Sequence, residues 1–277
     1  MGKEKAKISI AVFLCSLFIV LFFLPQGSTK AVADSEFLKG YKGEILSSFS
    51  TDFSSSASAR KSNIKIATER INGVVVGAGE IFSFNAVTGE RTKENGYKES
   101  PVIESGKYTI GVGGGVCQVS TTLYNAILLA GVKVVTVSPH SLPVGYVPPS
   151  RDAMVSRATD FRFFNDTPYP ISIEGEVKGN TLTFRIYGFS TLTDGEKIAF
   201  RSVVKESLKA NYEEVVDEEN SLADGEEYRV IKKAKDGLVS ECYKEVYYRG
   251  ELMSSSLVRR DVYKAENGVR LVRRTEE

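Results

Sequence analysis

A run of glycines that leads directly into an apolar segment constrains this chain more than any other feature. Gly111-Val-Gly-Gly-Gly115 precedes Val116-Cys-Gln-Val-Ser-Thr-Thr-Leu-Tyr-Asn-Ala126, in which apolar residues recur at helical spacing. Gly131 gives the helix a stop signal. The pattern predicts a helix over residues 116–130 that starts at a glycine turn. Apolar residues on two of its faces indicate that it is covered on both sides.

Cys117 stands in the first turn of this helix, where a nucleophile would be favoured. Unpaired N–H groups and the positive end of the helix dipole stabilise a thiolate over a thiol. His140, the only histidine of the chain, follows the next predicted strand at residues 132–137. This order is the layout expected of a cysteine nucleophile and its base. The alternative is that Cys117 is a small apolar side chain that fills the core.

The loop after His140 supplies further polar candidates. Asp152 is suited to orient His140, and Arg151 to pair with a substrate carboxylate or an oxyanion. The backbone N–H groups of Cys117 and Gln118 would form an oxyanion hole. The expected substrate-binding residues are Gly113, Gly114, Gly115, Gln118, Tyr146 and Arg151. In the alternative interpretation, Arg151 and Asp152 form a loop salt bridge and His140 is an ordinary loop residue.

The first 33 residues carry an export pattern. Three lysines precede an apolar run from Ile8 to Pro25, and Ala31-Val-Ala33 matches a small-x-small cleavage signal. A signal peptide over residues 1–33 is the first interpretation. The run also reaches the length of a membrane span, so an uncleaved N-terminal anchor is the alternative. Both place the rest of the chain outside the cytoplasm, either secreted or at the outer face of the cytoplasmic membrane.

The composition excludes several classes of function. The net charge is +1, which gives no electrostatic footprint for nucleic acid. One histidine and scattered cysteines do not make a zinc site of the usual kind, and we expect neither a metal nor a cofactor. Cys117 and Cys242 are the two cysteines beyond the export segment. A disulfide between them remains open, and it would rule out a free thiol at Cys117.

The remainder divides into two predicted domains. Residues 44–190 mix predicted helices at 63–71 and 116–130 with strands at 74–84, 161–164, 169–177 and 181–187, which predicts an α+β domain. Residues 101–110 alternate as in a hairpin that turns at Ser105-Gly106. Residues 198–277 are highly charged and show alternating strands separated by Asp-Gly and Arg-Gly turns. This pattern predicts a small, elongated, all-β C-terminal domain with a thin core.

Seven motifs follow one another in the first predicted domain, and together they resemble a VanW-type domain over residues 47–187. They are Glu69-Arg-Ile-Asn-Gly73, Gly79-Glu-Ile-Phe-Ser-Phe-Asn85, Gly96-Tyr-Lys-Glu99, the glycine and cysteine segment 111–126, Pro139-His-Ser-Leu-Pro143, Tyr146-Val-Pro148 and Arg151-Asp-Ala153. The family takes its name from glycopeptide-resistance gene clusters of Gram-positive bacteria and occurs on cell-envelope proteins. The resemblance therefore implies a cell-envelope protein with the cell wall, or peptidoglycan, as its partner.

The second predicted domain resembles the five-glycine (G-five) module of wall-associated proteins. The match is carried by Ser221-Leu-Ala-Asp-Gly225, Asp236-Gly237 and Arg249-Gly250, while Ala234 stands where glycine is more usual. Two functions follow as expectations. The chain is a cysteine-dependent acyl transferase or peptidase acting on peptidoglycan peptides through Cys117 and His140. Alternatively, it is a non-catalytic wall-binding or accessory protein whose glycine-rich cleft holds a wall peptide or a protein partner.

Overall fold

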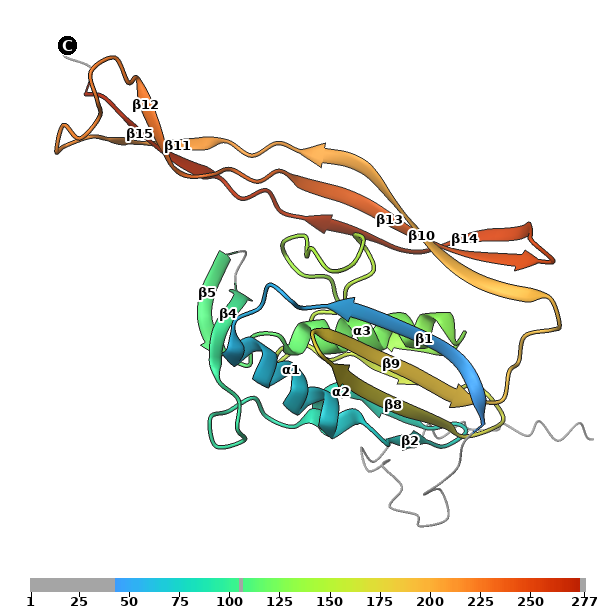
Figure 1. Ribbon diagram of the computed structural model, residues 1–277. Coiled ribbons are helices and arrows are strands. Elements are labelled where there is room, and N and C mark those ends of the chain that lie inside the picture. The colour runs from blue at the N-terminus through green and yellow to red at the C-terminus, as the bar shows by residue number, and fades with distance from the viewer. Residues whose placement is uncertain (1–42, 105–106, 275–277) are drawn as a thin grey trace, which may run out of the picture.

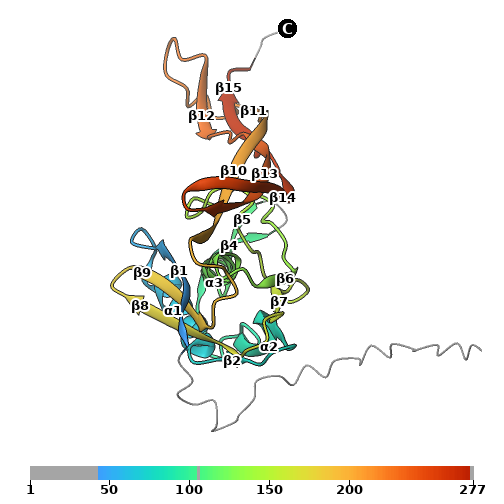
Figure 2. The same ribbon diagram turned by 90° about the vertical axis from the view of Figure 1, so that its right-hand side faces the viewer.

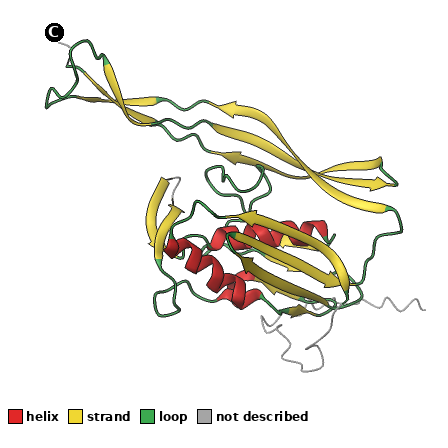
Figure 3. Ribbon diagram, viewed as in Figure 1, coloured by secondary structure: helices red, strands yellow, loops and turns green. Residues whose placement is uncertain are grey.

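A computed structural model describes residues 43–104 and 107–274 of the chain. The predicted export segment at residues 1–33 and the hairpin turn expected at Ser105-Gly106 lie outside the described residues. Within residues 43–104 and 107–274, no helix is both long enough and apolar enough to cross a membrane. Helices and strands mix in the N-terminal part, while strands and loops make up the C-terminal part (Figure 3).

The N-terminal part is built around a four-stranded sheet and two long helices (Figure 1). The sheet has the strand order β1-β9-β8-β2 and is antiparallel throughout. Its helices are α1 (Ser58–Ile71), the short α2 (Phe84–Thr88) and α3 (Val116–Leu129). Its strands are β1 (Glu44–Asp52), β2 (Val75–Val76), β3 (Ile81–Ser83), β4 (Glu99–Glu104), β5 (Lys107–Val112), β6 (Lys133–Thr136), β7 (Arg162–Phe164), β8 (Ile171–Lys178) and β9 (Thr181–Gly188).

Helix α3 lies at the centre of this part. It contacts β1 and β9 of the sheet, α1, β6, and the C-terminal strand β10. Val119, Leu123 and Ile127 are fully buried, and so are the polar side chains of Ser120 and Asn125 on other faces. The predicted coverage on both sides is confirmed. A helix buried all round is a rigid support for any side chain at its start.

The C-terminal part is an extended pair of three-stranded sheets (Figures 1 and 2). One sheet has the order β10-β13-β14 and the other the order β11-β15-β12. The bounds are β10 (Glu196–Leu208), β11 (Tyr212–Val216), β12 (Tyr228–Lys232), β13 (Gly237–Tyr248), β14 (Glu251–Tyr263) and β15 (Gly268–Val272). The sheet of β10, β13 and β14 lies across the N-terminal part, next to the loops that follow β6.

Two local expectations were wrong in detail. The helix expected at residues 63–71 begins at Ser58, five residues earlier, although no side chain caps its N-terminus. Residues 74–84, which the pattern predicts to be strand-like, form two short strands and then enter α2. The Ser83 hydroxyl accepts a hydrogen bond from the Ala86 amide, so Ser83 acts as an N-cap and the strand ends there.

Candidate active site

Three consecutive glycines shape the turn that leads into α3. Gly113 and Gly115 have positive φ angles of 89° and 105°, a conformation that residues with a side chain rarely adopt. A Cβ atom on Gly114 would meet the carbonyl oxygen of Pro101 in β4 at 2.5 Å. The turn therefore brings the start of α3 close to its neighbours. Packing accounts for all three glycines, and their contact with a substrate stays a prediction.

Cys117 is half-buried in the first turn of α3. Its Sγ donates to the carbonyl oxygen of Val155 at 3.3 Å, and the His140 ring lies close enough to lower the pKa of the thiol. Among the described residues, its backbone N–H has no backbone acceptor, whereas the Gln118 N–H donates to the Gly115 carbonyl at 3.0 Å. One N–H at the positive end of the helix is thus left to stabilise an anion beside Sγ.

His140 lies in the loop after β6 and is only 5% exposed. The buried Asp152 holds it at two points: Oδ2 accepts from the His140 backbone N–H at 2.7 Å and lies 2.6 Å from Nδ1. Because Asp152 engages Nδ1, Nε2 is the ring nitrogen left for the thiol. The structure therefore brings together Cys117, His140 and Asp152 in the arrangement of a nucleophile, a base and an orienting carboxylate.

The charges within this triad reinforce one another. Burial alone would raise the pKa of the Cys117 thiol, but the hydrogen bond and charge of His140 outweigh it, and the pKa is lowered. Burial likewise opposes the charged form of His140, yet its bonds to Asp152 and Cys117 raise its pKa to about 9. For Asp152, burial is outweighed by the bonds from His140 and Tyr263, so its pKa is lowered. Both shifts favour the thiolate–imidazolium pair over the neutral thiol and imidazole.

Two arginines that no sequence motif marked lie close enough to influence the thiol. Arg60 of α1 donates from Nη2 to Gln118 Oε1 at 2.8 Å, and Arg91 donates from Nη2 to Asn85 Oδ1 at 2.5 Å. Burial lowers the pKa of both guanidinium groups. The negative charge of Cys117 partly opposes this lowering. Both arginines therefore add positive potential around the sulfur.

Tyr146 is the predicted substrate-binding residue whose pKa is influenced by Cys117. It is half-buried in the loop that follows His140. Burial, followed by the charge of Cys117, raises its pKa. Its hydroxyl consequently keeps its proton.

Gln118 and Arg151 have side-chain partners other than the thiol. The Gln118 amide is 1% exposed and donates to the Thr51 hydroxyl at 3.0 Å, which ties α3 to β1. The Arg151 guanidinium stacks on Phe49 and Phe200, with its carbon Cζ 5.6 and 5.5 Å from the ring centroids. It also donates to the Phe200 carbonyl. The structure therefore gives these two side chains packing partners and does not bring them to the sulfur.

The C-terminal strands contribute side chains directly to the site. No motif in the sequence indicated this contribution. The Tyr263 hydroxyl at the end of β14 donates to Asp152 Oδ1 at 2.5 Å. Arg259 in the same strand donates to the Asp152 carbonyl at 2.9 Å, and the Lys264 amide donates to the Ser141 carbonyl at 2.8 Å. The alternation of Arg259, Asp261 and Tyr263 places all three on one strand face, and this spacing was the available signal.

A pocket of about 530 Å³ opens next to His140. Residues of both parts of the molecule line it: Ile103, Pro139, His140, Ser141, Met154, Val262 and Lys264. Neither Cys117 nor Cys242 forms a disulfide in the described structure, so the Cys117 thiol is free. The described residues also include no group of three His, Cys, Asp or Glu side chains placed to hold a metal ion.

Comparison with known proteins identifies the N-terminal part. The family model described as "VanW like protein" matches residues 59–187. The uncharacterized protein YoaR of Bacillus subtilis is 41% identical over 165 residues, which cover 59% of this chain and 54% of that protein. The Vancomycin B-type resistance protein VanW of Enterococcus faecalis is 32% identical over 111 residues, covering 38% of this chain and 40% of that protein. The chain thus spans about half the length of these two relatives.

Solved structures of two G5 domains are also similar to part of the chain. HP0197-G5 is 21% identical, covering 28% of this chain and 96% of that structure, with a TM-score of 0.18. The IgA1 protease G5 domain is 16% identical, covering 29% of this chain and 94% of that structure, with a TM-score of 0.20. The family match spans the motifs around Cys117 and His140, and residues 59–187 of this chain are a VanW-like domain.

Proposed function

We propose that this chain is an exported cell-envelope protein that transfers or hydrolyses an acyl group on peptidoglycan peptides through Cys117. The observation that carries the proposal is the triad of Cys117, His140 and Asp152 at the start of a buried helix. A half-buried cysteine with a lowered pKa next to a buried imidazolium has the properties of an activated nucleophile.

In the first half-reaction the Cys117 thiolate attacks a peptide carbonyl carbon and forms a carbon–sulfur bond. The carbonyl π electrons move to oxygen, and the free Cys117 N–H at the helix start stabilises this oxyanion. The oxyanion then re-forms the carbonyl and the carbon–nitrogen bond breaks. The proton on His140 Nε2 passes to the leaving amine, which leaves a thioester and a neutral imidazole.

In the second half-reaction an amine or a water molecule enters in place of the leaving amine. Neutral His140 takes a proton from it as it attacks the thioester carbonyl. The carbon–sulfur bond breaks, and the electron pair returns to sulfur. The thiolate–imidazolium pair is thereby restored, with Asp152 holding the ring in one orientation throughout.

The positive potential around the sulfur favours a substrate that carries a carboxylate near the scissile bond. Arg60 and Arg91 supply this potential, and Lys264 lines the pocket beside His140. Guanidinium groups bind carboxylates through charge-assisted hydrogen bonds. A peptidoglycan stem peptide, which ends in a carboxylate, meets this requirement.

The proposed location rests on the N-terminal sequence and on the family. The lysines, apolar run and Ala31-Val-Ala33 support export, with the membrane as a further partner if the segment is not cleaved. The match to VanW, a protein whose name records vancomycin resistance, supports a role at the cell wall. Mass spectrometry of the protein isolated from its native cells tests export: a mature N-terminus near Asp34 is expected, or an intact N-terminus in the membrane fraction. A soluble cytoplasmic product that starts at Met1 would contradict it.

A thioester is the decisive intermediate. The purified protein, incubated with synthetic stem peptides, should gain the mass of the acyl group at Cys117, and hydroxylamine should remove that mass. The Cys117→Ala variant should gain nothing, whereas Cys242→Ser should behave as the wild type, because Cys242 is fully buried elsewhere. If the wild type forms no adduct and its Cys117 reacts with iodoacetamide as an ordinary thiol does, the catalytic proposal fails.

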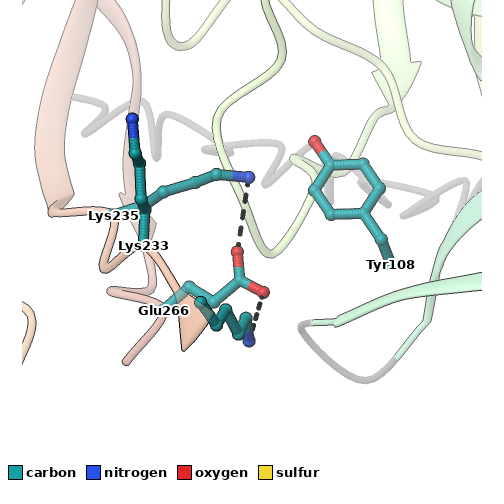
Figure 4. A pocket seen from close by; sticks show the side chains of 5 residues that line it. Tyr108, Lys233, Lys235 and Glu266 are labelled. Atoms are coloured by element: carbon teal, nitrogen blue, oxygen red, sulfur yellow. Dashed lines mark ion pairs between the residues drawn. The ribbon is translucent and has the colours of Figure 1, made fainter. Parts of the chain in front are cut away.

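A second pocket favours wall binding as an additional function. It measures about 390 Å³ and lies between Tyr108 of β5 and the C-terminal residues Lys232, Lys233, Lys235 and Glu266. Glu266 forms ion pairs with Lys232 and Lys235, at 2.8 and 3.5 Å. Figure 4 shows Glu266, Lys235 and Tyr108 around this pocket. Three lysines against one glutamate leave a positive cleft suited to an anionic wall polymer. Lys233→Glu should weaken sedimentation with purified cell walls without altering acyl transfer, and unchanged sedimentation would exclude this cleft.

A further inference from the structure

Tyr263 is the one residue of the C-terminal strands that reaches the triad through a side-chain hydroxyl. The hydroxyl donates to Asp152 Oδ1 at 2.5 Å and accepts from the Ser150 backbone N–H at 2.6 Å. The whole side chain is buried. The other oxygen of Asp152, Oδ2, serves His140 alone. Each oxygen of the carboxylate therefore has its own partner, one from each part of the molecule.

Further bonds fix the C-terminal strands next to this contact. Ser240 of β13 is hydrogen-bonded to the hydroxyl of Ser150 at 2.6 Å. In the sheet, Ser240 pairs with Asp261 and Leu238 pairs with Tyr263, so these contacts come from adjacent positions of two paired strands. Arg259 and the Lys264 amide hold the backbone at Asp152 and Ser141. The loop that carries the triad is thus bound on one side by the C-terminal sheet.

The chemistry of Asp152 gives this contact a consequence. A buried carboxylate stays ionised only if hydrogen bonds compensate for lost hydration, and the bond from Tyr263 helps to lower the pKa of Asp152. Burial and the charge of Asp152 raise the pKa of Tyr263, so the phenol keeps the proton that it donates. Without this donor the carboxylate loses a partner for Oδ1 and is free to rotate away from the imidazole.

We propose that Tyr263 is a positioning residue of the Cys117 site and that the C-terminal strands are an integral part of that site. The proposal rests on the proposed acyl-transfer function. Tyr263 touches neither the sulfur nor a substrate. It acts by keeping the Asp152 carboxylate ionised and oriented towards the His140 ring. The C-terminal module is therefore required for thiol activation and is more than a spacer towards the wall.

The test is the pH dependence of Cys117 alkylation by iodoacetamide, followed by mass spectrometry of the Cys117 peptide in the intact chain. In Tyr263→Phe the alkylation midpoint should rise by about one pH unit, a loss of about tenfold in rate at pH 6. The matched control is Tyr243→Phe. Tyr243 is in β13 and donates its hydroxyl to Glu241 at 2.6 Å, away from Asp152, so its loss should leave the midpoint unchanged.

Ser240→Ala provides a second variant if Tyr263→Phe does not fold. It removes only the bond to Ser150 and should raise the midpoint in the same direction, by about half a unit or less. An unchanged or lowered midpoint in a folded Tyr263→Phe protein, or no shift in Ser240→Ala when that is the folded variant, overturns the proposal for Tyr263. A wild-type midpoint near the ordinary thiol value of about 8.5 instead contradicts the proposed function itself.

Discussion

The two parts of the molecule bury different kinds of side chain. The N-terminal part closes around a continuous apolar core that includes Leu123, Ile127, Phe163 and Phe184. In the C-terminal part, the buried apolar side chains described are Leu222, Val239, Cys242 and Tyr263, and many large ones, such as Leu257, are exposed. The C-terminal sheets are instead held by strand pairing and by ion pairs along their length.

The difference explains where the candidate site lies. A rigid apolar core fixes the start of α3 and hence Cys117, whereas the polar inner face of β13 and β14 supplies hydroxyl and guanidinium groups for the neighbouring loop. An apolar sheet could cover that loop but could not hydrogen-bond a buried carboxylate. At the contact between the two parts, the N-terminal part therefore supplies a rigid core and the C-terminal part supplies polar hydrogen-bond donors.

The largest effect should come from removing a core side chain of α3. Leu123 is fully buried, so Leu123→Ala should lower the free energy of unfolding by about 2–5 kcal/mol, because the cavity is only partly filled by relaxation. The matched change in the other part is Leu257→Ala in β14, where 54% of the side chain is exposed. Its cost should stay within about 0.5 kcal/mol.

Urea denaturation of both variants measures this contrast. Equal losses of unfolding free energy would mean that the exposed face of β14 is covered by something in solution. A small loss for Leu123→Ala would mean that α3 is not the centre of the core.

A smaller effect is expected from the glycine turn. Gly114→Ala would place a Cβ atom 2.5 Å from the Pro101 carbonyl oxygen, and should cost about 1–3 kcal/mol through displacement of backbone. Because the shift would move Cys117, the alkylation rate of the thiol should fall as well. Gly145→Ala is the control, since a Cβ there would meet no atom within 4 Å. An equal decrease in Tm for the two variants would show that close packing does not explain the glycine turn.

The pH dependence of stability should also separate the two parts. The pKa of His140 is raised to about 9 in the folded protein, above its ordinary value of about 6.5. Its stabilising contribution is therefore complete below about pH 6.5 and is lost as the pH rises through about 9. The pKa of Cys117 is lowered in the folded protein, so its effect on stability has the opposite pH dependence. Its stabilising contribution is lost as the pH falls through the pKa of the folded state.

The comparison that isolates His140 is the difference in Tm between the wild type and His140→Gln. This difference should shrink between pH 7 and pH 10. The ion pairs of the C-terminal sheets join lysine or arginine to carboxylates, which keep their charges over most of that range. A difference that grows with pH would contradict the raised pKa of His140.

Much of the N-terminal part could be predicted from the sequence because its signals are local. The 116–130 helix ends one residue early, and the strands at 171–178 and 181–188 lie close to those expected. The prediction that pairs Cys117 with His140 rests on the same kind of signal, since the helix start and the strand before His140 are both marked by glycine and apolar spacing. Tyr263, Arg60 and Arg91 were missed because their role depends on contacts between segments distant in sequence, which no local pattern records.

The smallest effect should come from the ion pairs of the C-terminal part. Lys209 and Asp236 lie 2.6 Å apart, but 79% of the lysine side chain is exposed. Water and salt screen such a pair, so Lys209→Met should change the free energy of unfolding by less than about 1 kcal/mol. Raising the salt concentration should make the two proteins converge further. A larger loss of unfolding free energy in urea would show that ion pairs stabilise these sheets in place of an apolar core. The two parts would then differ in the kind of interaction that stabilises them and not in how strongly they are stabilised.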